Sequence, residues 1–368
     1  MNPSKITIET ILAIRLVSHG LLTPAFLTGE DVVAQLGAMQ AQDFNMAKWA
    51  IGIRMPNGRE QTIVEAFNKG EILRTHVLRP TWHFVAPENI RWLLSLTADR
   101  IKAAANTRDR ELGITETLYE KVNHIMVDAL KGNRCLTREA ISEILIHSGI
   151  TVDNARMYHF MMRAEVEAIV CSGALQGKKQ TYALLDERVP PTNSHADLFP
   201  ASREEALAKL ARIYFTSHAP ATLQDFIWWS GLSTADARKG LNDIKQNFVE
   251  KEIVGQIYFV LANREEFVSD MIFNTNKAFL LPAFDEYIIS YCHRNIIISS
   301  ERCAKVISSN GIFRPVIVMN GKVIGTWRKT ALKSKPLTFE YFEQPDKLTR
   351  KAVEDAGEKL KTFYFDTI

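Results

Sequence analysis

The chain has 368 residues, of which 46% are hydrophobic and 24% are charged, and its net charge is +3 at pH 7. This composition is that of a globular protein of two to four compact units, with no apolar run long enough to span a membrane and no signal-peptide pattern. The cysteines form no CxxC pair, so we expect a reduced, cytoplasmic protein without a disulfide framework, a bound metal or a cofactor.

The N-terminal region predicts helices followed by a β-hairpin. Apolar residues recur at helical spacing, and the Thr28-Gly29-Glu30-Asp31 segment resembles a capping box. Two short strands, ILRTHVL and TWHFVA, then flank Arg79-Pro80. Helices and then a small hairpin is the order of a winged helix-turn-helix module. The helices are expected at 6–22, from Thr28 onward, at 46–53 and at 61–68.

The same order of elements recurs twice further along the chain. Residues 135–185 and residues 221–261 each predict a Thr-capped helix that ends at a glycine, a second helix and a glycine-containing hairpin. Gly149 and Gly231 end the two capped helices in this interpretation. Three copies of one pattern predict three tandem winged-helix modules.

Past residue 275 the sequence changes to β-rich segments and a closing helix. The segment VMNGKVIGTW carries an Asn-Gly hairpin signal, and residues 345–365 predict the helix. We therefore predict an α+β fold in which three winged helix-turn-helix modules precede a small antiparallel β-barrel-like region and a C-terminal helix. The predicted boundaries are 1–110, 111–190, 191–275 and 276–368, with a Pro- and Ser-rich linker at 189–202.

Gln40 and Gln42, in Met39-Gln40-Ala41-Gln42-Asp43, are candidates for an uncharged functional pair. Amide side chains do not titrate near neutral pH, but they orient a water through paired donors and acceptors. Residues i and i+2 point apart on a helix and to one side of an extended segment. The two can therefore act together only if the helix ends near Met39. From spacing alone, a helix cap or a solvent-exposed position is the simpler interpretation.

Three segments, MQAQD, LRPTWHFV and LLPAFDEYIISYCHR, together resemble the AlkZ-like family of winged-helix DNA glycosylases. The family removes alkylated bases and unhooks interstrand crosslinks, and the resemblance covers nearly the whole chain. Its most specific mark is a glutamine–residue–glutamine motif, matched by Gln40 and Gln42. Related members carry aspartate at the second position, so Gln42 indicates the AlkZ-like branch. Ala41 departs from the bulkier apolar residue that is common between them.

The resemblance implies a monofunctional glycosylase that hydrolyses the N-glycosidic bond of cationic N-alkylated purines in double-stranded DNA, with crosslinks as a further substrate. A base that already carries positive charge leaves readily. Gln40 and Gln42 then need only position a water and stabilise an oxocarbenium-like sugar. No lysine nucleophile is required, so we expect no lyase step, and we expect a monomer that binds no membrane.

Asp43, Thr81, His83 and Asp285 are candidates to support the active site. Asp43 is the nearest carboxylate to the glutamine pair, although a capping or surface role suits its position better. His83 stands beside an aromatic residue, where a histidine is usually structural, and Thr81 is a candidate partner for it. Asp285 follows Pro282, and capping of a turn is the favoured role there.

Five basic residues are expected to contact DNA phosphates. Two flank the first hairpin, two stand at the tip of the second in Gln176-Gly177-Lys178-Lys179, and one lies near the C-terminus. A solvated surface is the competing interpretation of each. These residues are Arg74, Arg79, Lys178, Lys179 and Arg328.

Two other classes of function compete with a glycosylase. A winged-helix transcriptional regulator without catalysis would explain the modules but leave the glutamine pair unexplained. A structural or scaffolding protein would use MQAQD and TWH for packing only. Release of a damaged base from DNA separates an enzyme from both.

Overall fold

The computed structural model describes residues 7–190, 200–253, 255–262, 276–330 and 336–365. The chain forms two compact units. One combines Met1–Ile63 with Leu207–Ile368 and is called the split unit below; the other, Val64–Ala206, is called the inserted unit. The predicted linker at 189–202 lies largely outside the described residues, and the predicted four-part division of the chain remains a prediction.

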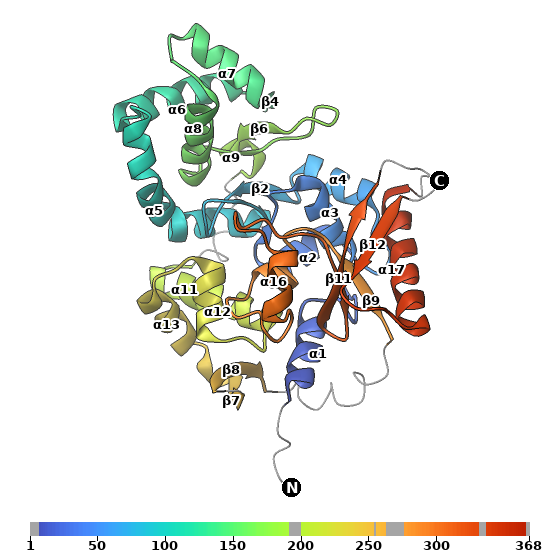
Figure 1. Ribbon diagram of the computed structural model, residues 1–368. Coiled ribbons are helices and arrows are strands. Elements are labelled where there is room, and N and C mark those ends of the chain that lie inside the picture. The colour runs from blue at the N-terminus through green and yellow to red at the C-terminus, as the bar shows by residue number, and fades with distance from the viewer. Residues whose placement is uncertain (1–6, 191–199, 254, 263–275, 331–335, 366–368) are drawn as a thin grey trace. The chain divides into compact units, whose positions relative to one another are not determined.

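The split unit begins with short helices (Figure 1), three of which carry a side-chain cap at the N-terminus. The side chains of Thr7, Thr28 and Asp43 each accept a hydrogen bond from the backbone N–H three residues on, which satisfies a donor that the first helical turn leaves unpaired. The predicted helices are confirmed, with the first one shorter than expected. Their bounds are α1 Ile8–Ser18, α2 Gly29–Leu36, α3 Phe44–Gly52 and α4 Glu60–Lys69, which leads into the inserted unit.

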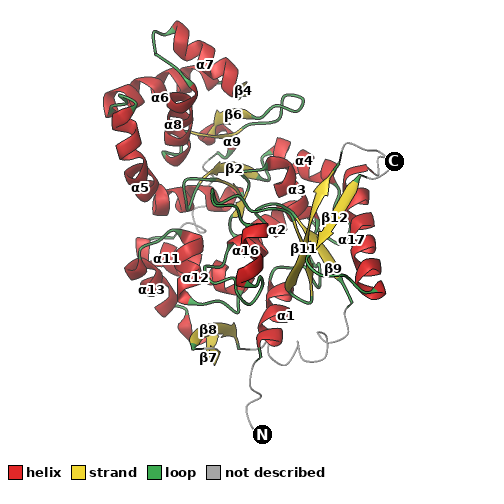
Figure 2. Ribbon diagram, viewed as in Figure 1, coloured by secondary structure: helices red, strands yellow, loops and turns green. Residues whose placement is uncertain are grey.

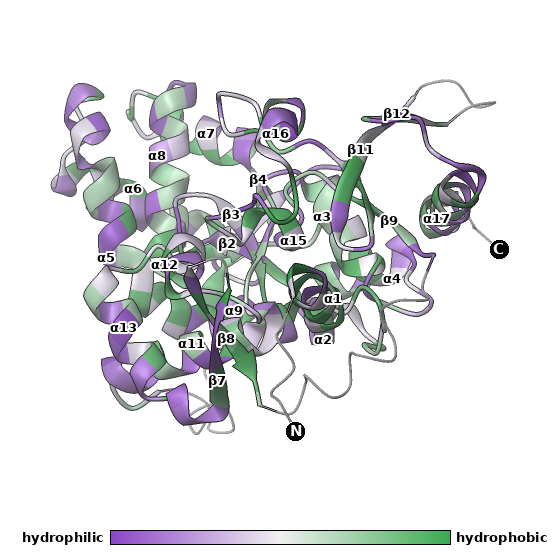
Figure 3. Ribbon diagram, turned by 60° about the horizontal axis from the view of Figure 1, so that its bottom comes forward, coloured by the Kyte–Doolittle hydropathy of each residue, from purple (hydrophilic) through white to green (hydrophobic). Residues whose placement is uncertain are grey.

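A second group of elements in the split unit follows α11 (Arg203–His218). Thr222 and Asp225 form a reciprocal capping box, and Gly231 ends that helix in the left-handed conformation, as predicted. A hairpin follows, whose second strand is hydrophobic over most of its length while the middle of the first is hydrophilic (Figure 3). The elements are α12 Leu223–Ser230, α13 Thr234–Asn242, β7 Phe248–Ile253 and β8 Gln256–Leu261.

The C-terminal part of the split unit is a four-stranded antiparallel sheet in the order β12-β11-β10-β9. Asn320 and Gly321 both have positive φ in the turn between β10 and β11, so the predicted Asn-Gly hairpin is confirmed. The closing helix α17 is confirmed as well, and its Phe363 ring lies 5.1 Å from the Trp49 ring of α3. The bounds are β9 Ala278–Leu281, β10 Val316–Met319, β11 Lys322–Lys329, β12 Leu337–Tyr341 and α17 Lys347–Phe365.

The β-barrel-like prediction for residues 276–368 is wrong, because the described strands form an open sheet whose edges are β9 and β12. The segment between β9 and β10, expected to be β-rich, instead contains two short helices, α15 (Glu286–Ile289) and α16 (Ser300–Val306). Pro282 follows β9 and cannot donate a ladder hydrogen bond, and Asp285 then caps α15. The chain therefore leaves the sheet where a barrel would need another strand.

The inserted unit is mostly helical, with short strands (Figure 2). The predicted first hairpin, β2 with β3, and the Thr137-capped helix α7 are both confirmed. A small sheet in the order β4-β6-β5 packs with α6, α7 and α8 around a core that includes Val122, Leu145 and Phe160. The bounds are β2 Leu73–His76, β3 Trp82–Val85, α5 Pro87–Glu111, α6 Glu116–Leu130, β4 Leu136–Thr137, α7 Arg138–His147, α8 Asn154–Val166, β5 Val170–Ser172, β6 Thr181–Leu184 and α9 Leu185–Arg188.

A fully buried ion pair connects Arg54, just after the C-terminal end of α3, to Asp285, the N-cap of α15, within the split unit. The two terminal nitrogens of Arg54 donate to the two carboxylate oxygens of Asp285 over 2.9 and 2.8 Å. The same guanidinium donates to the carbonyl oxygens of His19 and Ala50. Because both charged groups are out of contact with water, each depends on the other for its stability in the interior.

Replacement of Arg54 by methionine is therefore expected to destabilise the protein by about 3–5 kcal/mol, since the Asp285 charge is left buried without its partner. The free energy of unfolding in urea measures this loss. The matched control is Lys351→Met, which breaks an exposed pair with Asp355 on α17 and should leave stability essentially unchanged. Equal effects of the two substitutions would contradict this account of the buried pair.

Candidate active site

The segment that carries Gln40 and Gln42 is extended. Helix α2 ends at Leu36, and Gly37 follows with a φ of +78°. A Cβ atom on that residue would lie 2.5 Å from a methyl carbon of Ile213, so both the turn and the close packing require glycine. Residues Met39–Gln40 then form the short strand β1. The expectation that the helix ends near Met39 is confirmed, with its end three residues earlier.

Gln40, at the end of β1, and Gln42, in the bend that follows, have different surroundings. Gln40 is buried, with 6% of its surface exposed, whereas Gln42 is exposed in the bend before α3. The backbone N–H of Gln42 donates to the side-chain oxygen of Gln40 over 3.1 Å. This bond folds the Gln40 amide over the turn and restricts its orientation. The two residues are therefore linked by a hydrogen bond, but the Gln40 side chain is buried whereas the Gln42 side chain is exposed.

The backbone of Gln40 is held by a carboxylate that sequence reasoning did not select. Its N–H donates to Oε1 of Glu286, on α15, over 2.6 Å. The other oxygen, Oε2, accepts from the indole N–H of Trp229 over 3.2 Å and from the hydroxyl of Ser290. Glu286 is 2% exposed. Its one sequence signal is an acidic residue within an apolar run, Phe-Asp-Glu-Tyr-Ile-Ile, which indicates a buried and satisfied carboxylate.

Glu286 remains ionised although it is buried. Burial by itself raises the pKa of its carboxyl group, but the nearby His218 ring first, and then the hydrogen bonds from the Ser290 hydroxyl and the Gln40 N–H, outweigh burial and hold that pKa at about 2. Nε2 of His218 lies 3.8 Å from Oε2 of Glu286, beyond hydrogen-bonding distance. Burial lowers the pKa of His218 itself. The carboxylate behind Gln40 is thus the group of this cluster that carries charge at neutral pH.

A second histidine, His19, extends the cluster. Its ring lies edge-on to that of His218 at 4.7 Å, and its Nε2 lies 2.8 Å from the hydroxyl of Tyr291. That hydroxyl donates to the carbonyl oxygen of His218, so His19 must donate in turn. Burial first, then His218 and the nearby Arg54, hold the pKa of His19 well below its usual value. Uncharged histidines therefore fill the interior beneath the glutamine segment.

The other candidates of the split unit are held in structural contacts. Asp43 caps α3 by accepting from Met46 N–H over 3.0 Å. Asp285 caps α15 and pairs with Arg54. Arg328 is exposed on β11, and its Nε donates to the hydroxyl of Thr338 over 3.1 Å. The capping roles favoured for the two aspartates are confirmed, and a part in the active site remains a prediction for both.

The remaining candidates belong to the inserted unit. His83 is buried on β3, and its Nδ1 lies 2.9 Å from the backbone oxygen of Thr81. The two residues are paired, therefore, but through the backbone of Thr81; among the described residues, the Thr81 hydroxyl has no hydrogen-bond partner. The guanidinium of Arg74 lies 4.3 Å from the centre of the Trp82 ring. Arg79 is half-buried in the turn between β2 and β3.

Lys178 and Lys179 are both exposed at the tip of the hairpin between β5 and β6. Gln176 and Lys179 pair across this tip, and Gly177 takes a positive φ of 62° there. The predicted Gly-Lys-Lys tip is confirmed as a turn. Its contact with phosphates remains a prediction.

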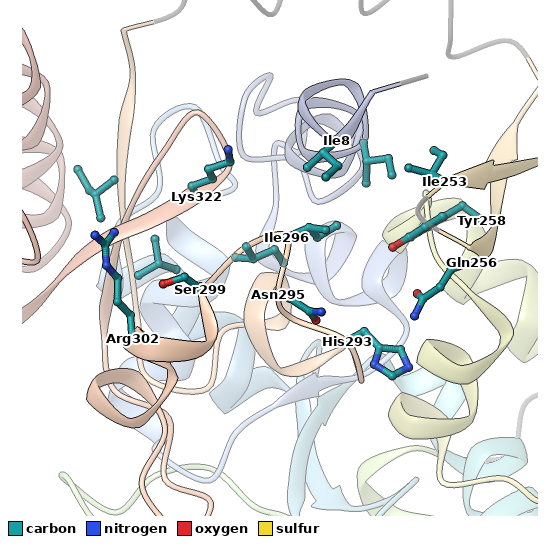
Figure 4. A pocket seen from close by; sticks show the side chains of 14 residues that line it. Ile8, Ile253, Gln256, Tyr258, His293, Asn295, Ile296, Ser299, Arg302 and Lys322 are labelled. Carbon is teal, nitrogen blue, oxygen red and sulfur yellow. The ribbon is translucent and has the colours of Figure 1, made fainter. Parts of the chain in front are cut away.

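A cavity of about 510 Å³ lies elsewhere in the split unit (Figure 4). Ile8 of α1, Tyr258 of β8 and Arg302 of α16 contribute to its wall. The lining side chains that the structure describes do not include Gln40 or Gln42.

Within the described ranges of the chain, no cluster of three or more His, Cys, Asp or Glu side chains has the geometry to hold a metal ion. Within the same ranges, every helix is too short or too polar to cross a bilayer.

Comparison with known proteins gives one consistent result. The family model described as AlkZ-like DNA glycosylase matches residues 33–363. An interstrand DNA cross-link repair glycosylase of Streptomyces sahachiroi is 22% identical over 336 residues, which is 89% of this chain and 88% of that protein. The solved structure of the Streptomyces sahachiroi DNA glycosylase AlkZ has a TM-score of 0.80 at 21% identity and covers 98% of this chain and 97% of that chain. The two share a fold.

The buried histidines predict how stability depends on pH. In the unfolded chain His19 takes up a proton below about pH 6.5, whereas in the folded chain its lowered pKa keeps it neutral. Unfolding then binds protons, so stability should fall as pH falls from 7 to 5, by up to about 1.4 kcal/mol per pH unit for each such histidine. The contribution of Glu286, with its pKa lowered to about 2, is lost only below about pH 4.5.

Urea unfolding at pH 7, 6 and 5 tests this expectation. His19→Asn should lower stability at pH 7 and flatten the dependence between pH 7 and 5, because it removes one of the two buried histidines whose pKa is lowered, His19 and His218. A stability that is the same at pH 7 and pH 5 would show that the interior histidines are not held neutral.

Proposed function

This chain belongs to the AlkZ-like DNA glycosylase family, and from that premise we propose that it hydrolyses the N-glycosidic bond of cationic N-alkylated purines in double-stranded DNA. In this proposal the enzyme is monofunctional: it releases the base, leaves an abasic site and forms no bond to the sugar through a lysine. The observation that carries the proposal is the Gln40–Gln42 turn, held by its own hydrogen bond in a chain that the family model matches over residues 33–363.

The charge of the lesion explains why neutral residues are sufficient. Cleavage of the bond builds positive character on the sugar, and a neutral leaving base needs a proton from a general acid. A purine alkylated on a ring nitrogen is already cationic and leaves without that proton. The enzyme then has to orient a water and stabilise a cation, and both tasks suit groups that are fixed in advance.

Gln40 and Gln42 take different parts in the proposed mechanism. Gln40 is buried, and its side-chain oxygen already accepts a hydrogen bond from the Gln42 N–H, so the orientation of its amide group is restricted. The exposed Gln42 can reach a ligand from the same turn. We assign Gln40 to the sugar, where its fixed dipole stabilises developing positive charge, and Gln42 to the attacking water. Asp43, Thr81, His83 and Asp285 are proposed as supporting residues of the site.

We also propose that the chain is built from winged-helix modules. In the inserted unit the order α6-β4-α7-α8-β5-β6, with the sheet order β4-β6-β5, supports this interpretation. In the split unit the order α11-α12-α13-β7-β8, with Ala221 paired to Phe259, supports it as well. The boundaries 1–110, 111–190, 191–275 and 276–368 belong to the same proposal.

The relative from Streptomyces sahachiroi is named for interstrand crosslink repair. We extend that activity to this chain as a second proposed substrate, since both ends of a crosslink at purine nitrogens are alkylated bases. DNA binding is assigned to Arg74, Arg79, Lys178, Lys179 and Arg328, and the enzyme is proposed to act as a cytoplasmic monomer. A non-catalytic regulator is not favoured, because the family model that matches the chain is described as AlkZ-like DNA glycosylase.

Incubation with duplex DNA that contains N7-methylguanine is expected to release free base and leave abasic sites. Gln40→Ala combined with Gln42→Ala should slow this release by about 100-fold or more, because the groups that orient water and stabilise the sugar are removed. Single-turnover rates with excess enzyme measure the effect. The matched control is Gln256→Ala, an amide in the cavity away from the glutamine segment. Release at the wild-type rate by the double variant would end the assignment of both glutamines.

The lysines at the hairpin tip make a separate prediction. If Lys178 and Lys179 each contact one phosphate, their replacement by glutamine should reduce the slope of log affinity against log salt by about 2. Fluorescence anisotropy with a labelled duplex at several salt concentrations measures the slope. Lys121→Gln, on an exposed position of α6, is the control. A slope that is unchanged in the tip variant would assign both lysines to solvent.

A further inference from the structure

The contacts of Glu286 differ from those of two other buried carboxylates in the split unit. Asp285 forms a bidentate pair with Arg54, and Asp225 lies 3.7 Å from Arg15. The described partners of Glu286 are instead the N–H of Gln40 and the donors Trp229 and Ser290. Its negative charge is therefore stabilised by these hydrogen-bond donors and by the His218 ring, whose Nε2 lies 3.8 Å from Oε2, with no arginine among these contacts.

We propose that Glu286 is a positioning residue for Gln40 and that its buried charge stabilises the cationic transition state through that residue. This inference rests on the proposed glycosylase function and deepens it. Glu286 then supplies the negative charge that the neutral side chains of Gln40 and Gln42 lack.

Geometry supports the positioning part. Gln40 is held at its backbone by the 2.6 Å bond to Glu286 and at its side chain by the 3.1 Å bond from Gln42. A hydrogen bond to an ionised acceptor is about twice as strong as one between neutral groups. The pair of bonds fixes both the peptide and the amide of Gln40. Loss of the first bond would free the strand that carries the motif.

Electrostatics supports the second part. Glu286 is 2% exposed, so it does not meet water or a substrate directly and cannot act as a base or as a nucleophile on the sugar. Its charge is nevertheless one hydrogen bond away from Gln40, in an interior where fields are screened less than in water. A donated N–H next to the carboxylate polarises the Gln40 peptide. The carboxylate, acting across this polarised peptide, would attract positive charge that develops on the sugar or on the damaged base.

The decisive variant is Glu286→Gln, which keeps the size of the side chain and an oxygen for the Gln40 N–H but removes the charge. We expect single-turnover release of N7-methylguanine to slow by about 10- to 100-fold. Affinity for the same duplex should stay within about twofold, because a buried group does not bind DNA. A residue that only supports the fold would lower the melting temperature without this division between rate and affinity.

Asp225→Asn is the matched control, since it removes the charge of an equally buried carboxylate that caps α12 and contacts no part of the glutamine segment. It should lower the melting temperature and leave the release rate of the folded enzyme unchanged. A wild-type rate in Glu286→Gln would overturn the proposal. So would an equal loss of rate in Asp225→Asn.

A measurement on the wild-type chain serves if Glu286→Gln does not fold. The backbone amide proton of Gln40 should resonate far downfield in the NMR spectrum and exchange slowly with solvent, because it is donated to a buried carboxylate. An ordinary shift with fast exchange would overturn the positioning role. If the wild-type enzyme releases no methylated base, the proposed function fails and the electrostatic role fails with it; the Gln40 amide signal then still decides the contact.

Discussion

The interior of the split unit is governed by the rule that a buried charge must be compensated. Arg54 and Asp285 satisfy it as an ion pair, and this pair holds the start of α15 against the segment that follows α3. The next residue, Glu286, satisfies it with hydrogen-bond donors and thereby captures the backbone of Gln40. One short helix thus carries two adjacent carboxylates, of which the first secures the helix and the second secures the glutamine segment. The position of the motif depends on both.

The uncharged character of the surroundings has a chemical consequence. Two histidines lie near the glutamine segment, and burial lowers the pKa of both. Neither is then a ready source of the proton that a neutral leaving base would require. The ionised carboxylate of Glu286 and the two amides form an environment that favours a cation. This agrees with a glycosylase that acts on bases whose positive charge comes from the alkylation itself.

Local features of the fold were predictable from the sequence because they depend on neighbouring residues. Caps at Thr28 and Thr222 follow from short-range hydrogen bonds, and the turn at Asn320-Gly321 follows from the ability of both residues to adopt positive φ. The barrel-like prediction was wrong because sheet closure depends on contacts between distant segments. A β-rich composition does not reveal where a chain leaves a sheet. Here the chain leaves it at Pro282, directly after β9, and Asp285 then caps α15.

The sequence by itself determined the family, through MQAQD and its companion segments, and it determined the chemical character of the candidate site, since Gln40 and Gln42 are neutral in any fold. Only the tertiary structure decided what holds them. Glu286 is 246 positions from Gln40 along the chain, and the sequence analysis selected its neighbour Asp285 instead. Which of two adjacent carboxylates faces the motif depends on the direction in which α15 packs. No local pattern contains that information, because it arises from contacts between segments that are distant in sequence.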